Sequence, residues 1–336
     1  MRRAFLLDPS DAEALDEVER LASVADRWSA LRGLAEEVAR ERLSLSGTTK
    51  RDIFLRAAAW YRDHLNDFAA SEVALRSALE LDPDASEAYA RLIVLLRAVG
   101  REAELVAALR AWAAVEQDED ARKEHWHEAA QIAESQLGDV DTAIACHEAV
   151  LGLDGHEPRS LEALYRLRSA RGQWVEAAQV LRKRIDAEVD PQRRVDLRLQ
   201  LAALLAEQLD DTEAALKAYR GVIEEDPFNE NALLALERAY EAHQRWEDLR
   251  ELLDRRLEMA SSPEERISVR VRLARMAEQA FGQRSEASDQ LQEILELDPA
   301  HGEALDELER LLLLESRWPQ VAEILRRRFD EARMRG

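Results

Sequence analysis

The stretch Asp8-Pro-Ser-Asp-Ala-Glu-Ala-Leu-Asp-Glu-Val-Glu-Arg-Leu21 decides the fold, because it returns near the other end of the chain as Asp298-Pro-Ala-His-Gly-Glu-Ala-Leu-Asp-Glu-Leu-Glu-Arg-Leu311. The Asp-Pro pair that opens both copies also stands at residues 82–83 and 226–227, which gives spacings of 74, 144 and 72. Halving the longest spacing leads to Asp154-Gly155, which lies in a matching context. The chain therefore repeats every 72 residues, with two additional residues once, and we expect these in the loop of residues 44–50.

Other residues keep the same register. We call the Asp-Pro pair, or Asp154-Gly155 in its place, the mark of each repeat. A tryptophan follows the mark by about twenty residues in four of the repeats, at Trp28, Trp174, Trp246 and Trp318, and Glu102 replaces it in the second. A tryptophan that recurs in this way could anchor a partner. We interpret the set as packing between neighbouring elements, because each repeat needs the same internal contact.

Each repeat is predicted to hold four helices. In the repeat of residues 227–299, apolar residues recur at helical spacing in four segments, and the breaks between them fall around His243–Arg245, at Pro263 and at Gly282. Gly100 and Gly172 mark the turn after the first helix in their repeats. The four helices form two hairpins, which we call hairpin 1, directly after the mark, and hairpin 2. The whole chain then contains nine hairpins, five of the first kind and four of the second.

Two helices in about 36 residues resemble the tetratricopeptide repeat, a helix–turn–helix unit of 34 residues. In hairpin 2, Phe54, Ala58 and Tyr61 match three positions of the family's first helix, a large aromatic residue, a small residue and then an aromatic or apolar residue. Trp126, Ala130 and Ala133 do the same one repeat later, and Ala215, Tyr219, Val222 and Pro227 match the family's second helix. The resemblance implies an all-α, right-handed solenoid of about nine hairpins and eighteen helices, which forms one domain over residues 1–336.

Hairpin 1 departs from the family pattern at one position. Where the family has a small residue, the repeats carry Glu19, Tyr165, Glu237 and Glu309. We therefore expect hairpin 2 to match the family better than hairpin 1.

Composition excludes several classes of protein. The chain of 336 residues carries 69 acidic and 47 basic side chains, a net charge of −22, which opposes binding to nucleic-acid phosphates. Its single cysteine, Cys146, allows no internal disulfide and fits a reducing compartment such as a bacterial cytoplasm. No apolar run approaches the roughly 18 residues of a membrane span, and the apolar start is too short for a secretion signal. Phosphate-binding loops and hydrolase motifs are absent.

The first residues suggest that the array is cut from a longer one. Residues 4–9 match the end of a fourth helix such as residues 294–299, so the helix to which they belong lacks its beginning. Apolar surface should then be uncovered around Phe5-Leu6-Leu7 at one end and Ile324 and Phe329 at the other. Such patches predict end-to-end self-association.

An arginine ladder is the main candidate for partner binding. One position in the first helix of hairpin 1 holds Arg20, Arg166, Arg238 and Arg310. By the family resemblance this position faces the concave groove, where arginines could grip an acidic or carboxylate-ended peptide. Alternatively, the arginines form surface ion pairs with Asp16, Glu162 and Asp306, four residues earlier.

Two further sets have mainly structural interpretations. The basic pairs Lys183-Arg184, Arg255-Arg256 and Arg327-Arg328 close the second helix of hairpin 1, where cations complement the helix dipole. The other set, in which a soft metal site is conceivable, consists of His125, His127, Cys146, His147 and His156. His125 and His127 point to different sides of a helix, so packing or exposure is the simpler interpretation, and we predict no metal and no cofactor. We nevertheless predict His127, together with the four arginines, as a candidate residue for contact with a partner.

The sequence thus predicts a non-enzymatic scaffold that presents a groove to a peptide or protein. An RNA-binding helical repeat is one alternative, which the acidic balance opposes. The targeting or regulatory arm of a larger enzyme is another.

Overall fold

The computed structural model describes residues 12–41 and 45–335, and within them every regular element is helical, with no β-strand. Eighteen α-helices, α2 to α19, account for the nine predicted hairpins, so the predicted all-α class is confirmed. In the described residues no helix is long and apolar enough to cross a bilayer. The chain forms two compact units, Met1–Ala187 and Glu188–Gly336, and the boundary between them in the sequence falls between two hairpins.

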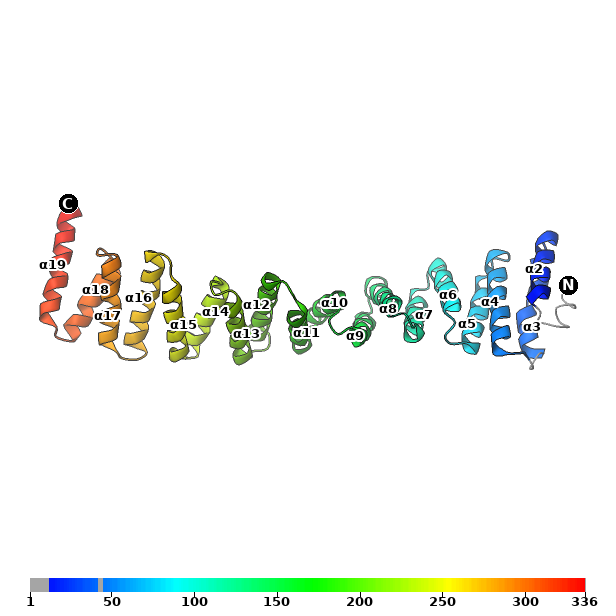
Figure 1. Ribbon diagram of the computed structural model, residues 1–336, viewed down its shortest axis with the longest axis horizontal. Helices are drawn as coiled ribbons and strands as arrows, with labels where there is room; N and C mark the ends of the chain where they lie inside the picture. Colours follow the sequence, from blue (N-terminus) through cyan, green and yellow to red (C-terminus); the bar gives the residue numbers. More distant parts are fainter. Residues whose placement is uncertain (1–11, 42–44, 336) are drawn as a thin grey trace. The chain divides into compact units, whose positions relative to one another are not determined.

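The first unit contains the helices up to α11 (Figure 1). Its bounds are α2 (Ala12–Ala25), the 3₁₀ turn η1 (Trp28–Leu31), α3 (Leu34–Glu41), α4 (Gly47–Asp63), α5 (Phe68–Leu81), α6 (Ser86–Val99), α7 (Glu102–Val115), α8 (Glu119–Ile132), the π-helical segment η2 (Ala133–Leu137), α9 (Val140–Leu153), α10 (Pro158–Ala170) and α11 (Trp174–Ala187).

The second unit contains four hairpins. They are built from α12 (Pro191–Glu207), α13 (Thr212–Glu225), α14 (Glu230–Ala242), α15 (Trp246–Met259), α16 (Pro263–Gln279), α17 (Arg284–Leu297), α18 (Gly302–Leu314) and α19 (Trp318–Arg335). From α3 to α11 and from α12 to α19, each helix packs against the next one along the chain, so successive hairpins stack side by side.

The 72-residue register is confirmed element by element. The first helices of hairpin 1 begin at residues 86, 158, 230 and 302, and those of hairpin 2 at residues 47, 119, 191 and 263. The two additional residues fall between Glu41 and Gly47, where later repeats connect the equivalent helices more briefly, as from Val115 to Glu119. The insertion therefore lies before α4, whereas the predicted loop of residues 44–50 ran into that helix.

In the four later repeats, whose marks the structure describes, the aspartate of the mark ends a helix and forms a turn with the backbone two residues on. Asp226 caps α13, and its Oδ1 accepts a hydrogen bond at 3.3 Å from the backbone N–H of Phe228, two residues on. The equivalent bonds of Asp82, Asp154 and Asp298 measure 3.3, 3.1 and 3.0 Å. Asp154 makes this bond without a following proline, which explains why Asp154-Gly155 takes the place of an Asp-Pro pair.

The turn inside each hairpin needs one residue with positive φ. In hairpin 1 this residue is glycine only at Gly100 and Gly172, with φ of 71° and 68°. Asp26, Gln244 and Ser316 adopt the same left-handed conformation at the equivalent positions, with φ of 48°, 54° and 57°. Glycine is the favoured residue for such a conformation but is not required, so the sequence marks only some of these turns.

Uncovered apolar surface at the ends agrees only in part with expectation. Phe329 is 67% exposed, whereas Ile324 is buried at 5%, because it lies on the side of α19 that packs against α18. Residues 5–7 lie outside the described part of the chain.

Candidate functional site: an ion-paired helix face

The four ladder arginines lie at equivalent points of α2, α10, α14 and α18, and all are exposed. Arg20 and Arg166 belong to the first unit, and Arg238 and Arg310 to the second. Whether they contact a partner therefore depends on what already neutralises each of them.

The expected pairs with acids four residues earlier do not form. Asp16 instead accepts from Arg56 at 2.5 Å, and Asp306 pairs with Arg328 at 3.0 Å. Arg20 pairs with Glu17, three residues earlier, at 2.7 Å. Residues three and four apart are both neighbours on a helix, so sequence spacing alone leaves the choice between them open.

Two ladder arginines reach an acid on an earlier helix. Arg166 makes two hydrogen bonds to the carboxylate of Glu134, at 2.5 and 2.7 Å. Arg310 donates to Glu278 at 2.5 Å and to Glu307 at 2.8 Å. The neighbouring Arg166 guanidinium lowers the pKa of Glu134, as expected for a bidentate charge pair.

Arg238 is the exception among the four. Ala206 stands where the other repeats have Glu134 or Glu278, and Ala235 stands where Arg310 has Glu307. Consequently, the side chain of Arg238 has no hydrogen bond or ion pair with any described residue. It is an exposed cation whose donors are not engaged.

The surroundings of Arg238 are a stripe of ion pairs along α14, α16 and α18. Glu241 on α14 accepts from Arg272 of α16 at 3.1 Å, and Arg275 of α16 pairs with Glu303 of α18. Leu234 lies four residues before Arg238, so it shares the same side of α14, and it is 43% exposed. The described residues of the second unit therefore form a mixed charged face, on which the guanidinium of Arg238 is free and lies beside an apolar side chain.

The residues of hairpin 1 that depart from the family pattern lie at the centre of a second set of contacts, separate from those of the ladder arginines. Glu237 is fully buried, and its two carboxylate oxygens accept from Arg256 of α15 and Arg272 of α16. Two charge-assisted bonds thus join three helices where the family has a small residue.

The other members of this set do the same less completely. Glu19 accepts from Trp60 at 2.8 Å and from Arg56 at 3.3 Å. Glu309 accepts from Arg328 at 2.6 Å, and at Tyr165 the guanidinium of Arg184 lies over the ring. The second arginine of each basic pair, equivalent to Arg256, therefore has a contact within its own hairpin.

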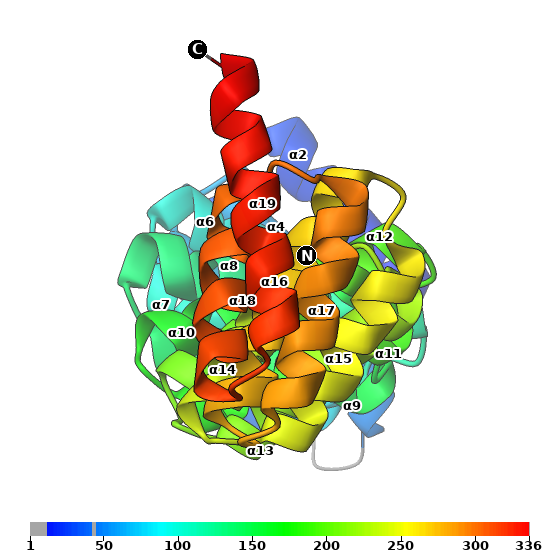
Figure 2. The ribbon, with the colours of Figure 1, turned by 90° about the vertical axis from the view of Figure 1, so that its left-hand side faces the viewer.

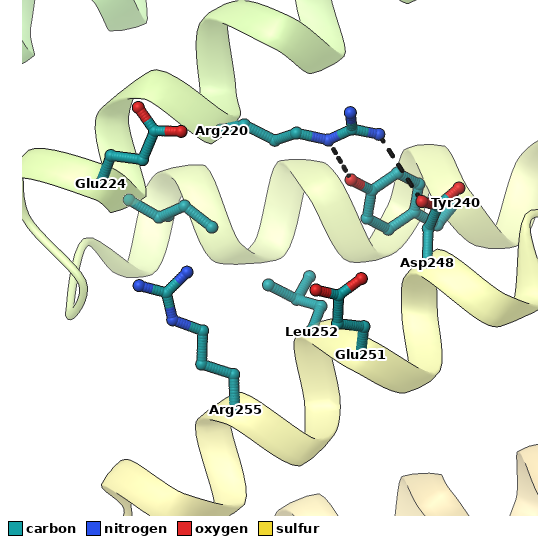
Figure 3. A pocket seen from close by; sticks show the side chains of 8 residues that line it. Arg220, Glu224, Tyr240, Asp248, Glu251, Leu252 and Arg255 are labelled. Atoms are coloured by element: carbon teal, nitrogen blue, oxygen red, sulfur yellow. Dashed lines mark hydrogen bonds and ion pairs between the residues drawn. The ribbon is translucent and has the colours of Figure 1, made fainter.

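A pocket of about 270 Å³ lies between α13, α14 and α15 (Figure 3). Arg220 crosses it and donates to the hydroxyl of Tyr240 at 2.8 Å, with Asp248 at 3.7 Å (Figure 3). The guanidinium of Arg255 faces the same hollow. Tyr240 and Arg238 are two residues apart on α14, so the pocket opens on roughly the opposite side of that helix from the ion-paired face.

Equivalent pockets occur in the first unit at the same register. One is lined by Glu148, Arg168 and Lys183, each 72 residues before Arg220, Tyr240 and Arg255. A second, one further repeat earlier, is lined by Arg76, Leu96 and other residues of α5, α6 and α7. The charge of the lining changes from repeat to repeat while the position stays, so we interpret the pocket as a product of hairpin stacking.

His127 lies inside the first unit. Its ring is 4% exposed, 5.7 Å from the ring of His147, and its Nε2 is 3.5 Å from a carboxylate oxygen of Glu157. Burial lowers the pKa of both histidines, that of His147 to about 4. The structure thus places His127 away from the surface, where it could not touch a partner directly. The described residues contain no group of three side chains that could hold a metal ion.

Cys146 is fully buried in α9, and burial raises the pKa of its thiol from 9.0 to about 11. The fraction present as thiolate at neutral pH falls by about a hundredfold as a result. We expect the native chain to react with a disulfide reagent such as 5,5′-dithiobis(2-nitrobenzoate) about a hundredfold more slowly than the chain unfolded in urea. Equal rates before and after unfolding would contradict the burial of this thiol.

Sequence reasoning missed the arginines of α16. Arg272 and Arg275 belong to hairpin 2, and neither departs from the family pattern, so no feature of the sequence assigned them to the charged face. The signal that could have found them is the separation of 31 or 32 residues that recurs between partners such as Glu241 and Arg272, or Glu278 and Arg310.

One family model of the tetratricopeptide repeat matches residues 160–195 and 232–267, and another matches residues 198–229. The first two segments cover copies of hairpin 1 and the third covers a copy of hairpin 2, so both kinds of hairpin match the family. Among curated proteins, none matches the chain.

Several solved structures are similar at low identity. A tetratricopeptide repeat protein from Parabacteroides merdae is 14% identical, with 78% of this chain and 98% of that chain covered and a TM-score of 0.29. The C-terminal part of a repeat protein from Cytophaga hutchinsonii is 16% identical, with coverages of 76% and 99% and a TM-score of 0.32. YrrB, described as a TPR protein with an unusual peptide-binding site, is 15% identical, with coverages of 55% and 90% and a TM-score of 0.30.

Proposed function

This chain is a tetratricopeptide repeat protein, and from that premise we propose that it is a scaffold that binds an acidic or carboxylate-ended peptide on the face formed by α14, α16 and α18. Such repeats generally serve as interaction scaffolds and not as enzymes. We also propose that the protein resides in a reducing compartment such as the cytoplasm, because its single cysteine is buried and unpaired.

The free guanidinium of Arg238 is the observation that carries this proposal. An acidic ligand that approaches Arg310 must compete with Glu278 and Glu307, whereas Arg238 offers its planar fork without breaking an existing pair. Leu234 beside it supplies apolar contact for a neighbouring ligand side chain. The remaining ion pairs of the face, each contributing about 0.2–1 kcal/mol, can exchange partners as the ligand extends along α16 and α18.

The net charge of −22 works against an acidic ligand at long range. The affinity must then come from the ion pair between Arg238 and a ligand carboxylate. The distance between these two charges is short compared with the roughly 8 Å over which physiological salt screens charges. Salt should therefore change the affinity for this peptide only modestly, because it weakens the local attraction and the overall repulsion together.

Arg238→Ala is expected to weaken binding of such a peptide by about tenfold to a hundredfold, since a hydrogen bond to a charged group contributes roughly 1.5–3 kcal/mol. A pool of fluorescein-labelled decapeptides with free carboxyl ends is sorted on the wild-type chain, and the best binder is measured by fluorescence anisotropy. Arg310→Ala is the matched control, with an expected change of less than about threefold, because that arginine is already neutralised. Selection of basic peptides, or equal loss in both variants, would refute the proposal. Single-stranded RNA of mixed sequence, measured in the same way, tests the alternative of an RNA-binding repeat.

A further inference from the structure

Helix α19 carries an apolar stripe that no described residue of the second unit covers. Trp318, Leu325 and Phe329 recur at helical spacing and are 62%, 48% and 67% exposed. Figure 2 looks directly onto this helix and shows no other helix of the second unit in front of it. Other apolar residues of α19 are buried, at 6% for Val321 and 5% for Ile324, so only its outward side is uncovered.

The same side of α15, one repeat earlier, shows what kind of structure fits there. Leu253, the equivalent of Leu325, is only 1% exposed. It lies in a core cluster with Val269, Leu273 and Met276 of α16, and Trp246 and Leu257, the equivalents of Trp318 and Phe329, pack against that cluster. The stripe on α19 therefore has the shape and the side chains of a surface that receives a helix like α16.

A carboxylate next to the stripe is incompletely paired. Glu237 of α14 is bonded by Arg256 from its own hairpin and by Arg272 from α16. At the equivalent place in α18, Glu309 has Arg328 from its own hairpin and no second arginine among the described residues, and its side chain remains 22% exposed. The missing donor is the one that the next helix provides elsewhere.

The first unit repeats this arrangement with another helix. Arg56 of α4 occupies the place of Arg272, and it bonds the equivalent carboxylate, Glu19. Around these arginines the two helices share a spacing, apolar-x-x-Arg-apolar-x-x-apolar, in residues 53–60 and 269–276. Ile53, Ala57 and Trp60 are buried, as are their counterparts in α16.

We infer that the exposed stripe of α19, together with Glu309, is a second interaction surface, which binds an amphipathic helix of a partner protein. The bound helix presents three apolar residues at this spacing to Trp318, Leu325 and Phe329. Its arginine, placed next to the central apolar residue, donates to Glu309. This surface uses neither Arg238 nor the ion pairs of α14 and α16, so it is independent of the acidic-peptide proposal.

The test uses the full chain and a peptide with the sequence of residues 263–279, labelled with fluorescein. A lactam bridge on the side away from Val269, Leu273 and Met276 holds the peptide helical, because a free peptide of this length is only marginally so. Saturable binding by fluorescence anisotropy is expected. Leu325→Asp in the chain should weaken it by at least about tenfold, because a charge then faces the apolar side of the helix. Val24→Asp, which changes an exposed valine in the first unit, is the matched control and should have no effect.

A double-mutant cycle tests the arginine contact. Replacing the peptide residue that corresponds to Arg272 with glutamine should weaken binding to the wild-type chain by about fivefold and leave binding to Glu309→Gln unchanged. Absence of saturable binding, or equal binding of a scrambled peptide, would overturn the inference. Sedimentation of the chain alone separates a further outcome: if it forms dimers that Leu325→Asp dissolves and the peptide does not displace, the occupant is a second copy and the assignment of a partner helix is wrong.

Discussion

Glu237→Ala is expected to destabilise the second unit by roughly 3–5 kcal/mol, the effect typical of removing one partner from a buried charge network. The carboxylate is fully buried, and each of its oxygens accepts from a different arginine. Removing it leaves the guanidiniums of Arg256 and Arg272 partly buried, with less than a third of each side chain exposed. Arg272 retains Glu241 at 3.1 Å, so Arg256 suffers most. Urea unfolding followed by far-UV circular dichroism measures the change.

Glu309→Ala is the matched control in the same unit. The Glu309 side chain is 22% exposed and has a single arginine, and Arg328 keeps Asp306 at 3.0 Å after the substitution. The expected loss is below about 1 kcal/mol, as for exposed pairs. Replacing the network as a whole, by Glu237→Leu with Arg256→Met and Arg272→Met, should recover much of the stability lost in Glu237→Ala. Similar losses in Glu237→Ala and Glu309→Ala would show that the buried network does not stabilise the unit.

The positions of the helices could be predicted because their boundaries are set by local chemistry. An aspartate that accepts from the backbone two residues on, or a proline such as Pro191 or Pro263 in the first turn, acts within a few residues of its own place in the chain. Such signals survive in a single sequence, and their repetition every 72 residues reinforces them. The break at residues 243–245 could be predicted from the interrupted helical spacing, but no glycine marks the residue that turns left-handed there, Gln244, whose φ is 54°.

The partners of the charged side chains could not be predicted in the same way. Glu134 and Arg166 are 32 residues apart, and they meet because hairpins stack, which helical periodicity alone does not specify. Glu237 was visible as a departure from the family pattern, but its cause lies in two arginines on other helices. Likewise, Arg238 is unpaired because Ala206, on an earlier helix, stands where other repeats supply a glutamate.

His127 shows a different limit. A histidine in a helix rich in charged residues gives no sign of burial, and its environment depends on His147 and Glu157, which later helices contribute. What sequence suggested as a ligand or a contact is, in the structure, a buried pair of imidazoles. Their burial has a consequence for the dependence of stability on pH.

The first unit is expected to lose stability as the pH falls from about 6.5 to about 4, by up to about 3 kcal/mol from His147 alone. Burial lowers the pKa of His147 to about 4, and the nearby charge of Arg159 contributes in the same direction against the opposing effect of Glu134 and Glu157. The unfolded chain, with an ordinary histidine pKa of 6.5, therefore binds a proton at a pH where the folded chain does not. The contribution is complete above pH 6.5 and is lost as the pH approaches the folded value. His127, whose pKa burial also lowers, adds to the loss in the same direction.

His147→Gln should flatten this dependence, because glutamine keeps a polar group near Ser160, which lies 3.2 Å from Nδ1 of His147, and does not titrate. The measurement is the urea midpoint of the full chain at pH values from 4 to 7.5, followed by the fluorescence of the tryptophans, five of which belong to the first unit. His156→Gln is the control, since His156 is exposed and its replacement removes a histidine without touching the buried pair. Carboxylates also gain protons in this range, so the comparison of slopes decides and not the wild-type loss itself. Parallel curves for wild type and His147→Gln would mean that the buried imidazole is not the group that couples folding to protons.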